Sequence, residues 1–451
     1  MNPKQKKHKR IILQRILTII LTVLFLSALT AGIIIAAGYL KPILSAEWEK
    51  MKKPLAPASA NEAPTEEPED DGWIINKKEE PEVDYADIPE PDPEAAAQSE
   101  EPEYDPKVEA VLSGMSLEQK AAQLFILTPE ALTGAETVTE AGDASKEALL
   151  QNPVGGIIYF SKNIEDPEQL SEMLRNMQLY AQEIEGFPLF LCVDEEGGRV
   201  SRIASNEAFE LTNMPPMEEV GNTGDIDSAY NAGFAIGMYL HDYGFNVDLA
   251  PVADLKASTS ENGIGDRSFG ESPELVSKMT WQFAEGLRSQ GVLPCFKHFP
   301  GLKGTVTDTH TGAAVLDQDL DELKESDLVP FENAIISGAH MIMASHASCP
   351  KITGDDTPAS LSPKMLTDIL RGELGFSGLI ITDSLSMGAI TESYSPGEAA
   401  KLAVAAGADL LLMPSDYAEA YAALVDAVRS GEISEERLDE SLRRILQVKI
   451  N

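Results

Sequence analysis

The sequence predicts an α/β protein whose main part is a (β/α)8 TIM barrel. From residue 107 onward, short apolar runs rich in β-branched residues alternate with longer amphipathic stretches, which is typical of parallel strands joined by helices. There are eight such runs over about 345 residues, which suits a closed barrel with insertions better than an open doubly wound sheet. The expected strands are 122–127, 155–160, 189–194, 245–251, 292–299, 340–346, 378–385 and 409–414.

Most of these runs are apolar throughout, as strands buried on both faces must be. Helical periodicity is clearest in residues 166–184, 272–291 and 361–375. The last two stretches begin with a Ser–Pro pair, which is typical of an N-cap followed by the first turn, and both end at a glycine. No glycine-rich nucleotide-binding motif follows any strand, so no dinucleotide or phosphate cradle is expected.

The first forty residues predict a membrane anchor. Residues 1–15 hold basic side chains and no acidic ones, and residues 16–40 contain no charged side chain. A helix needs about 20 apolar residues to cross a bilayer, whereas the apolar stretch of a cleaved signal peptide is roughly 7–15 residues long. We therefore expect a cytoplasmic basic segment at 1–15 and an uncleaved transmembrane signal anchor at 16–40, with the rest of the chain outside the cell. Cleavage near Ser45 and a buried core helix are the alternatives.

Residues 41–106 predict a disordered stalk rich in Pro and Glu. Within it, residues 54–106 carry two basic and eighteen acidic side chains, and such a segment cannot offset its ordering entropy by burial. We expect an extended, self-repelling tether. The short apolar segment at 72–78 could dock on the main domain, but we expect it to be an isolated exposed patch.

The net charge of the chain is −39, of which residues 107–451 carry −31. A chain this acidic lacks the basic face that phosphate backbones require, so a nucleic-acid partner is excluded. Cys192, Cys295 and Cys349 are too few and too widely spaced for a disulfide framework or a zinc site, and we expect three buried thiols. We expect a monomer that needs no cofactor and no metal.

Charged side chains stand at the ends of several predicted strands. Asp194 ends the third strand, Lys297 and His298 the fifth, His346 the sixth, and Asp383 follows the apolar part of the seventh. A charge at the end of a buried apolar run is costly unless it faces a polar pocket, and barrels place their chemistry at the carboxyl ends of the strands. These positions are therefore candidate site residues. His346 is the exception, because binding a backbone group explains it equally well.

Five motifs occur in a fixed order along residues 107–451: "VDEEGGRV", "GDRSFG", "KHFPG", the Asp-Thr-His of 308–310, and "ITDSLSMGAI". Together they resemble the β-N-acetylglucosaminidase (β-N-acetylhexosaminidase) branch of glycoside hydrolase family 3. The resemblance implies that residues 107–451 are a catalytic barrel of the family's N-terminal type. It implies a hydrolase that removes terminal β-linked GlcNAc with retention of configuration, from a GlcNAc-containing glycan partner.

The resemblance also implies individual roles. Asp383 matches the nucleophile that forms a covalent glycosyl-enzyme intermediate, His310 matches the general acid/base, and Asp308 matches the carboxylate paired with that histidine. The residues implied to hold the sugar's hydroxyl and N-acetyl groups are Asp194, Arg202, Arg267, Lys297 and His298. The roles implied for Asp383 and His310 agree with the chemistry, since a retaining glycosidase needs an ionised carboxylate as nucleophile and a group that first donates and then accepts a proton. Histidine titrates near neutrality and can do both.

Structural alternatives remain open for the basic residues. Lys297 and His298 could form buried ion pairs with Asp248 or Asp254, because charged groups at strand ends are usually paired. Arg267 could be a structural fork onto a carboxylate.

Functional alternatives also remain open. One is a phosphorylase of the same family, and another is a non-catalytic glycan-binding module on the cell surface. The expected setting is peptidoglycan turnover at the cell membrane. The −31 charge of residues 107–451 favours small soluble fragments over the polyanionic wall.

Overall fold

The computed structural model describes residues 104–257, 263–305, 312 and 314–450. The predicted basic segment, the anchor at 16–40 and the stalk up to residue 103 lie outside the described residues. The chain divides into two units, residues 1–91 and 92–451, and everything below concerns the second. Across the described ranges, no helix is long and apolar enough to span a bilayer.

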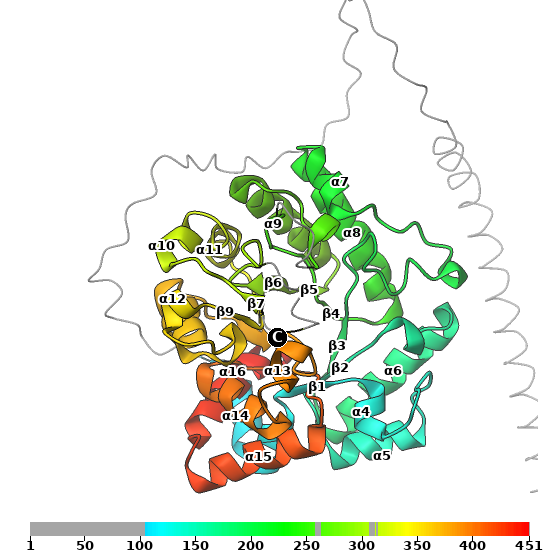
Figure 1. The fold of residues 1–451 in the computed structure, drawn as a ribbon. Helices are drawn as coiled ribbons and strands as arrows, with labels where there is room; N and C mark the ends of the chain where they lie inside the picture. Colours follow the sequence, from blue (N-terminus) through cyan, green and yellow to red (C-terminus); the bar gives the residue numbers. More distant parts are fainter. Residues whose placement is uncertain (1–103, 258–262, 306–311, 313, 451) are drawn as a thin grey trace, which may run out of the picture. The chain divides into compact units, whose positions relative to one another are not determined.

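Parallel strands form a ring at the centre of the described region (Figure 1). One sheet has the order β11-β1-β2-β3-β4-β5 and a second the order β10-β8-β6. Isolated parallel bridges join the two sheets, from Val252 to Lys297 and from Ile381 to Leu410. The bounds are β1 Phe125–Leu127, β2 Gly156–Ile158, β3 Phe190–Val193, β4 Val247–Asp248, β5 Leu293–Pro294, β6 Phe296–Phe299, β8 Met341–Ala344, β10 Leu379–Thr382 and β11 Leu411–Leu412.

Each of the eight predicted strands is confirmed, and the parallel α/β barrel is therefore confirmed as well. The predicted strand at 292–299 is divided at Cys295 into β5 and β6, because the Cys295 amide donates to the carbonyls of both Asp248 and Ala250. Two further short strands, β7 (Ala314–Val315) and β9 (Ala347–Ser348), pair with each other in parallel as a separate two-stranded sheet.

Helices surround the ring of strands (Figure 1). Their bounds are α2 Pro106–Gly114, α3 Leu117–Ala122, α4 Pro129–Thr133, α5 Asp143–Gln151, α6 Pro167–Ile184, α7 Met217–Asn222, α8 Ile226–Tyr243, α9 Pro273–Ser289, α10 Leu320–Lys324, α11 Val329–Ile336, α12 Pro350–Thr353, α13 Gly388–Thr391, α14 Pro396–Ala406, α15 Tyr417–Ser430 and α16 Glu435–Ile450, with a π-helix at Lys364–Glu373. The helices cover the outer faces of the strands, and the inner faces are buried inside the ring, which explains the apolar strand sequences.

The predicted helix starts are only partly confirmed. Ser272 caps α9 as expected, since its hydroxyl accepts from the Leu275 amide. The expected cap at Ser362 is wrong. Residues Ala359–Leu361 form a 3-10 turn that ends at Ser362, whose backbone carbonyl accepts from the next turn while its side chain caps no helix.

The core is continuous and contains the three cysteines as buried, free thiols, as predicted. Helices α8 and α9 pack at unusually short range because glycines face each other across the contact. A Cβ on Gly233 would lie 2.0 Å from the carbonyl oxygen of Phe283, so no other residue fits there.

Two ionisable side chains, the half-buried Glu185 and the buried Lys449, lie at the amino-terminal end of the barrel strands. The Lys449 ammonium donates to Gln123 Oε1 at 2.9 Å, and Gln123 Nε2 lies 3.4 Å from Glu185 Oε2. Burial raises the pKa of Glu185 to about 7 against the opposing attraction of Lys449. Burial likewise lowers the pKa of Lys449 to about 7 against the attraction of Glu185.

The substitution Glu185→Gln is expected to change how stability depends on pH. Because the folded pKa of Glu185 is raised, its contribution is fully present below pH 4.5 and is lost as the pH rises through 7. The variant's free energy of unfolding should therefore fall less steeply between pH 5 and 7, by up to about 1.4 kcal/mol per pH unit. Urea unfolding at several pH values measures this slope. Glu183→Gln, at an exposed glutamate of α6, is the matched control, and equal slopes for both variants would contradict the prediction.

Candidate active site

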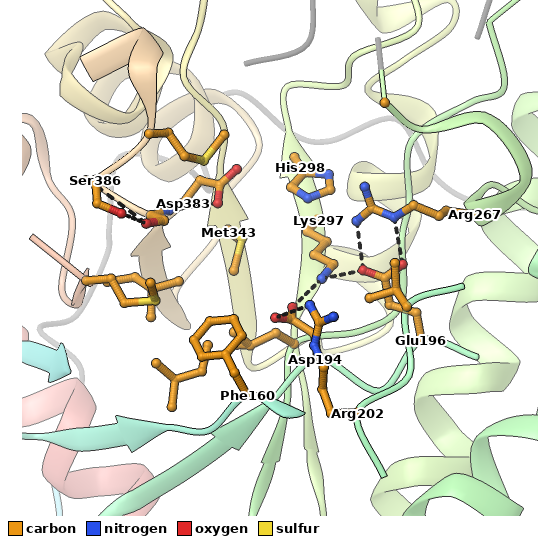
Figure 2. A pocket seen from close by; sticks show the side chains of 18 of the residues that line it. Phe160, Asp194, Glu196, Arg202, Arg267, Lys297, His298, Met343, Asp383 and Ser386 are labelled. Atoms are coloured by element: carbon orange, nitrogen blue, oxygen red, sulfur yellow. Dashed lines mark hydrogen bonds and ion pairs between the residues drawn. The ribbon is translucent and has the colours of Figure 1, made fainter. Parts of the chain in front are cut away.

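A cavity of about 610 Å³, here the central cavity, opens where the barrel strands end. It is lined by residues of β2, β6, β8 and β11 and by residues from the segments that follow β2, β3, β4 and β10. Figure 2 shows the main side chains. Charged side chains contribute much of the lining, and these are Asp194, Glu196, Arg199, Arg202, Arg267, Lys297, His298 and Asp383.

Six of the eight predicted site residues line this cavity, namely Asp194, Arg202, Arg267, Lys297, His298 and Asp383. The other two, Asp308 and His310, lie outside the described residues. The structure therefore brings together residues from motifs that are nearly 200 positions apart in the chain.

One wall of the cavity is a network of ion pairs (Figure 2). Lys297 Nζ lies 2.8 Å from Asp194 Oδ1 and 2.7 Å from Glu196 Oε1. Arg267 holds Glu196 in a two-point fork at 2.7 Å on each side. Arg202 extends the network to Asp194 at 3.6 Å. We call these five residues the ionic wall.

The ionic wall stays charged although Lys297 and Glu196 are each only 2% exposed. Burial disfavours ionisation of Glu196, but attraction to Arg267 and Lys297 outweighs it and holds the pKa of this carboxyl well below its usual range. Burial also opposes the charge on Lys297, and attraction to Asp194 and Glu196 raises its pKa nonetheless. Because the pKa of Glu196 is lowered, its stabilising contribution is complete at neutral pH and is lost only in acid.

Glu196 was not among the residues expected to form the site. It follows Glu195 directly, but the two glutamates face opposite ways. Glu195 is buried behind the wall and accepts from the Ser201 hydroxyl and from the amides of Ile203 and Ala204. Its role is to close the loop after β3, which leaves Glu196 to point into the cavity. No local signal in the sequence separates the two glutamates, because both stand between β3 and the glycine pair of the "VDEEGGRV" motif.

The pairing alternatives for the basic residues prove partly correct. His298 pairs with Asp254, whose Oδ2 lies 2.6 Å from His298 Nδ1 and accepts from the His298 amide at 3.1 Å. Lys297 pairs with neither Asp248 nor Asp254, because Asp194 and Glu196 lie closer to its ammonium. Each paired side chain still lines the cavity, so pairing orients these groups without removing them from the site.

The structural alternative for Arg267 is correct: its guanidinium forms a fork onto a carboxylate, and that carboxylate belongs to Glu196. Burial opposes the charge on this guanidinium, while attraction to Glu196 raises its pKa. Because Arg267 also lines the cavity, the fork fixes the guanidinium at the edge of the binding space.

Asp383 lies on the opposite side of the cavity from the ionic wall (Figure 2). It directly follows β10, and its amide donates to the Ala344 carbonyl at 2.8 Å. Its Oδ1 accepts from the Ser384 amide at 2.7 Å. Asp383 caps no helix of the described chain, because the next one, α13, begins after Met387. The carboxylate thus stands at a strand end, is oriented by the Ser384 amide and lines the cavity.

Most of the remaining lining is apolar. It includes Met343, which lies between Asp383 and the ionic wall, and Phe160, whose ring lies 5.6 Å beneath the Arg202 guanidinium (Figure 2). A cavity with one ionic wall and one apolar side suits an amphipathic ring such as a sugar. No group of three or more His, Cys, Asp and Glu side chains in the described ranges is arranged to hold a metal ion.

Residues 116–448 match the family described as "Glycosyl hydrolase family 3 N terminal domain". The chain belongs to glycosyl hydrolase family 3. The predicted family is confirmed. The match covers the barrel, the ionic wall and Asp383.

Relatives of this family 3 chain carry the predicted branch name. It is 33% identical over 325 residues to "Beta-hexosaminidase A" of Pseudoalteromonas piscicida, which covers 67% of this chain and 54% of that protein. It is 36% identical over 269 residues to "Beta-hexosaminidase" of Nitrosomonas eutropha, covering 58% of this chain and 74% of the relative. The chain thus spans about half the length of the first of these relatives.

A solved structure has the same fold. A family 3 β-N-acetylglucosaminidase from a Paenibacillus strain superposes with a TM-score of 0.69 at 35% identity, covering 74% of this chain and 62% of that one. The family 3 chain therefore resembles the β-N-acetylhexosaminidase branch in both sequence and fold.

Proposed function

We propose that the chain is a retaining exo-β-N-acetylglucosaminidase that hydrolyses terminal β-linked GlcNAc. The observation that carries the proposal is the placement of the Asp383 carboxylate across the central cavity from the ionic wall. Fixed, charged donors and acceptors hold a sugar by its hydroxyl groups, and a carboxylate on the other side then faces the anomeric carbon. The names of the relatives support the N-acetylhexosamine specificity.

In the proposed reaction, the Asp383 carboxylate attacks the anomeric carbon while the glycosidic bond breaks. His310, backed by Asp308, gives a proton to the departing oxygen and then removes one from the water that releases the sugar from Asp383. Two displacements at the same carbon restore the starting configuration. The roles of Asp308 and His310 rest on their place in the Asp-Thr-His motif, since both lie outside the described residues.

The proposed substrate is a small, soluble peptidoglycan fragment. Residues 107–451 carry a net charge of −31, which repels polyanionic wall polymers at low ionic strength. A soluble fragment meets less of this repulsion and fits a cavity of about 610 Å³. Faster turnover of insoluble wall than of a soluble GlcNAc-terminated disaccharide at low salt would contradict this part of the proposal.

An aryl β-GlcNAc assay on the purified protein tests the activity. Release of GlcNAc with initial β configuration, followed by NMR, is the expected result. In phosphate buffer, GlcNAc-1-phosphate would instead identify a phosphorylase. Binding of the glycan without turnover would identify a glycan-binding module.

The proposed location is the cell membrane, with residues 16–40 as a single span and the catalytic domain outside. This proposal rests on the charge-free length of residues 16–40 and on the basic residues that precede them. A protease added to intact cells is expected to release an active domain by cutting the acidic stalk. Full protection of the domain would reverse the topology.

A further inference from the structure

His346, which the sequence left unassigned, is fixed beside the turn that carries Asp383. It follows β8 by two residues, and its ring is 1% exposed. Its Nδ1 lies 2.7 Å from the Ser360 hydroxyl and its Nε2 lies 2.9 Å from the Ser384 carbonyl oxygen. The ring thus bridges the chain after β9 to the residue that follows Asp383.

These two contacts determine where the ring proton lies. A carbonyl oxygen only accepts, so Nε2 must carry the hydrogen that binds Ser384. In the neutral ring, Nδ1 then accepts from the Ser360 hydroxyl. Ser360 is itself fully buried, and its amide donates to the Ser345 carbonyl at 3.0 Å. The Ser384 carbonyl therefore selects the tautomer of His346, and Ser360 is a rigid partner for the other ring nitrogen.

Ser384 is the link from this histidine to the carboxylate. Its amide donates to Asp383 Oδ1 at 2.7 Å, while its carbonyl accepts from His346. Neighbouring backbone groups hold the turn on either side, since the Asp383 amide binds β8 and the Leu385 amide binds β11. The Ser384 carbonyl also accepts from the Met387 amide at 3.1 Å. His346 adds a buried side-chain restraint on the rotation of residue 384 and thus on the direction of the amide that binds Asp383.

We propose that His346 is a positioning residue for Asp383, acting through the backbone of Ser384 in the Nε2–H form that the Ser384 carbonyl requires. The proposal rests on the proposed function, in which Asp383 is the nucleophile. A carboxylate held within a fraction of an ångström attacks faster than one that samples other rotamers. Loss of the restraint should therefore reduce kcat more than it raises KM.

The test compares His346→Leu with His346→Gln. Glutamine places an amide N–H close to the position of Nε2 and keeps a donor for the Ser384 carbonyl, whereas leucine fills similar volume without one. The substrate is 2,4-dinitrophenyl β-GlcNAc, whose leaving group needs no proton, so its rate reports attack by Asp383. We expect kcat to fall about 10- to 100-fold in the leucine variant with KM within about threefold of wild type, and to stay within about threefold in the glutamine variant.

Controls separate positioning from folding. Ser360→Ala removes the partner of Nδ1 and should give an intermediate loss of kcat. 15N NMR of the imidazole should show the Nε2–H tautomer in both wild type and this variant, because the Ser384 carbonyl remains. Thermal unfolding of each variant identifies any that fails to fold. Full kcat in His346→Leu, or equal losses in the leucine and glutamine variants when both are folded, would overturn the role of His346 alone. An inactive wild-type enzyme would overturn the proposed function and this role with it.

Discussion

Asp383→Asn is expected to lower kcat on aryl β-GlcNAc by about 1,000-fold or more, because an amide oxygen cannot form the covalent intermediate. The change should not disturb the fold. Asparagine keeps the oxygen that accepts from the Ser384 amide at 2.7 Å, and the side chain faces the cavity. Steady-state rates and the thermal unfolding midpoint together measure the two effects.

Asp242→Asn is the matched control for this substitution. Asp242 is an exposed carboxylate near the end of α8, and its change should leave kcat unaltered. A sharper version uses Asp383→Ala with added azide. The small anion enters the vacated volume and attacks from the same side, so it should restore turnover and yield the α-glycosyl azide. Asp383→Asn with more than a tenth of wild-type activity would refute the assignment of the nucleophile.

Glu196→Gln is expected to reduce both stability and catalytic efficiency, because Glu196 is the carboxylate that joins Arg267 to Lys297. A glutamine offers one accepting oxygen and turns an N–H₂ donor toward a cation. Breaking a buried ion pair from one side costs about 3–5 kcal/mol. We expect a loss of this size in the free energy of unfolding and a fall of about 100-fold in kcat/KM.

Glu218→Gln gives the comparison for this second prediction. Glu218 pairs with Lys256 near the surface, where both side chains are about 30% exposed, so the loss should stay below about 1 kcal/mol. Urea unfolding measures both variants. If Glu196→Gln proves as stable and as active as Glu218→Gln, the ionic wall neither supports the fold nor holds the substrate.

The barrel was predictable because its strands are apolar at nearly every position and are separated by amphipathic helices. The site was predictable where a charge ended such a run, as at Asp194 and Asp383. Local pattern could not decide between Glu195 and Glu196, since both follow β3. That choice is made by Gly197 and Gly198, whose positive φ angles of 87° and 56° turn the chain.

The ion-pair partners of Lys297 could not be predicted from the sequence either. The sequence offered Asp248 and Asp254 as ion-pair partners for Lys297. Distances in the closed barrel select Asp194 and Glu196. The division of the fifth strand at Cys295 likewise depends on two carbonyls of another chain segment, which no local pattern records.

The two bridges that close the barrel have a consequence for its motions. Between Val252 and Lys297, and between Ile381 and Leu410, the sheets meet through single bridges, whereas neighbouring strands within each sheet share two or more pairs. Asp383 follows a strand of the smaller sheet, and Asp194 follows a strand of the larger one. The ion pairs from Lys297 on β6 to Asp194 and Glu196 therefore add a second connection between the two sheets where they otherwise meet only through the Val252–Lys297 bridge. A bound sugar that contacts both the ionic wall and Asp383 would also connect the two sheets across the cavity. Ligand binding should therefore suppress slow separation of the sheets at the Ile381–Leu410 bridge.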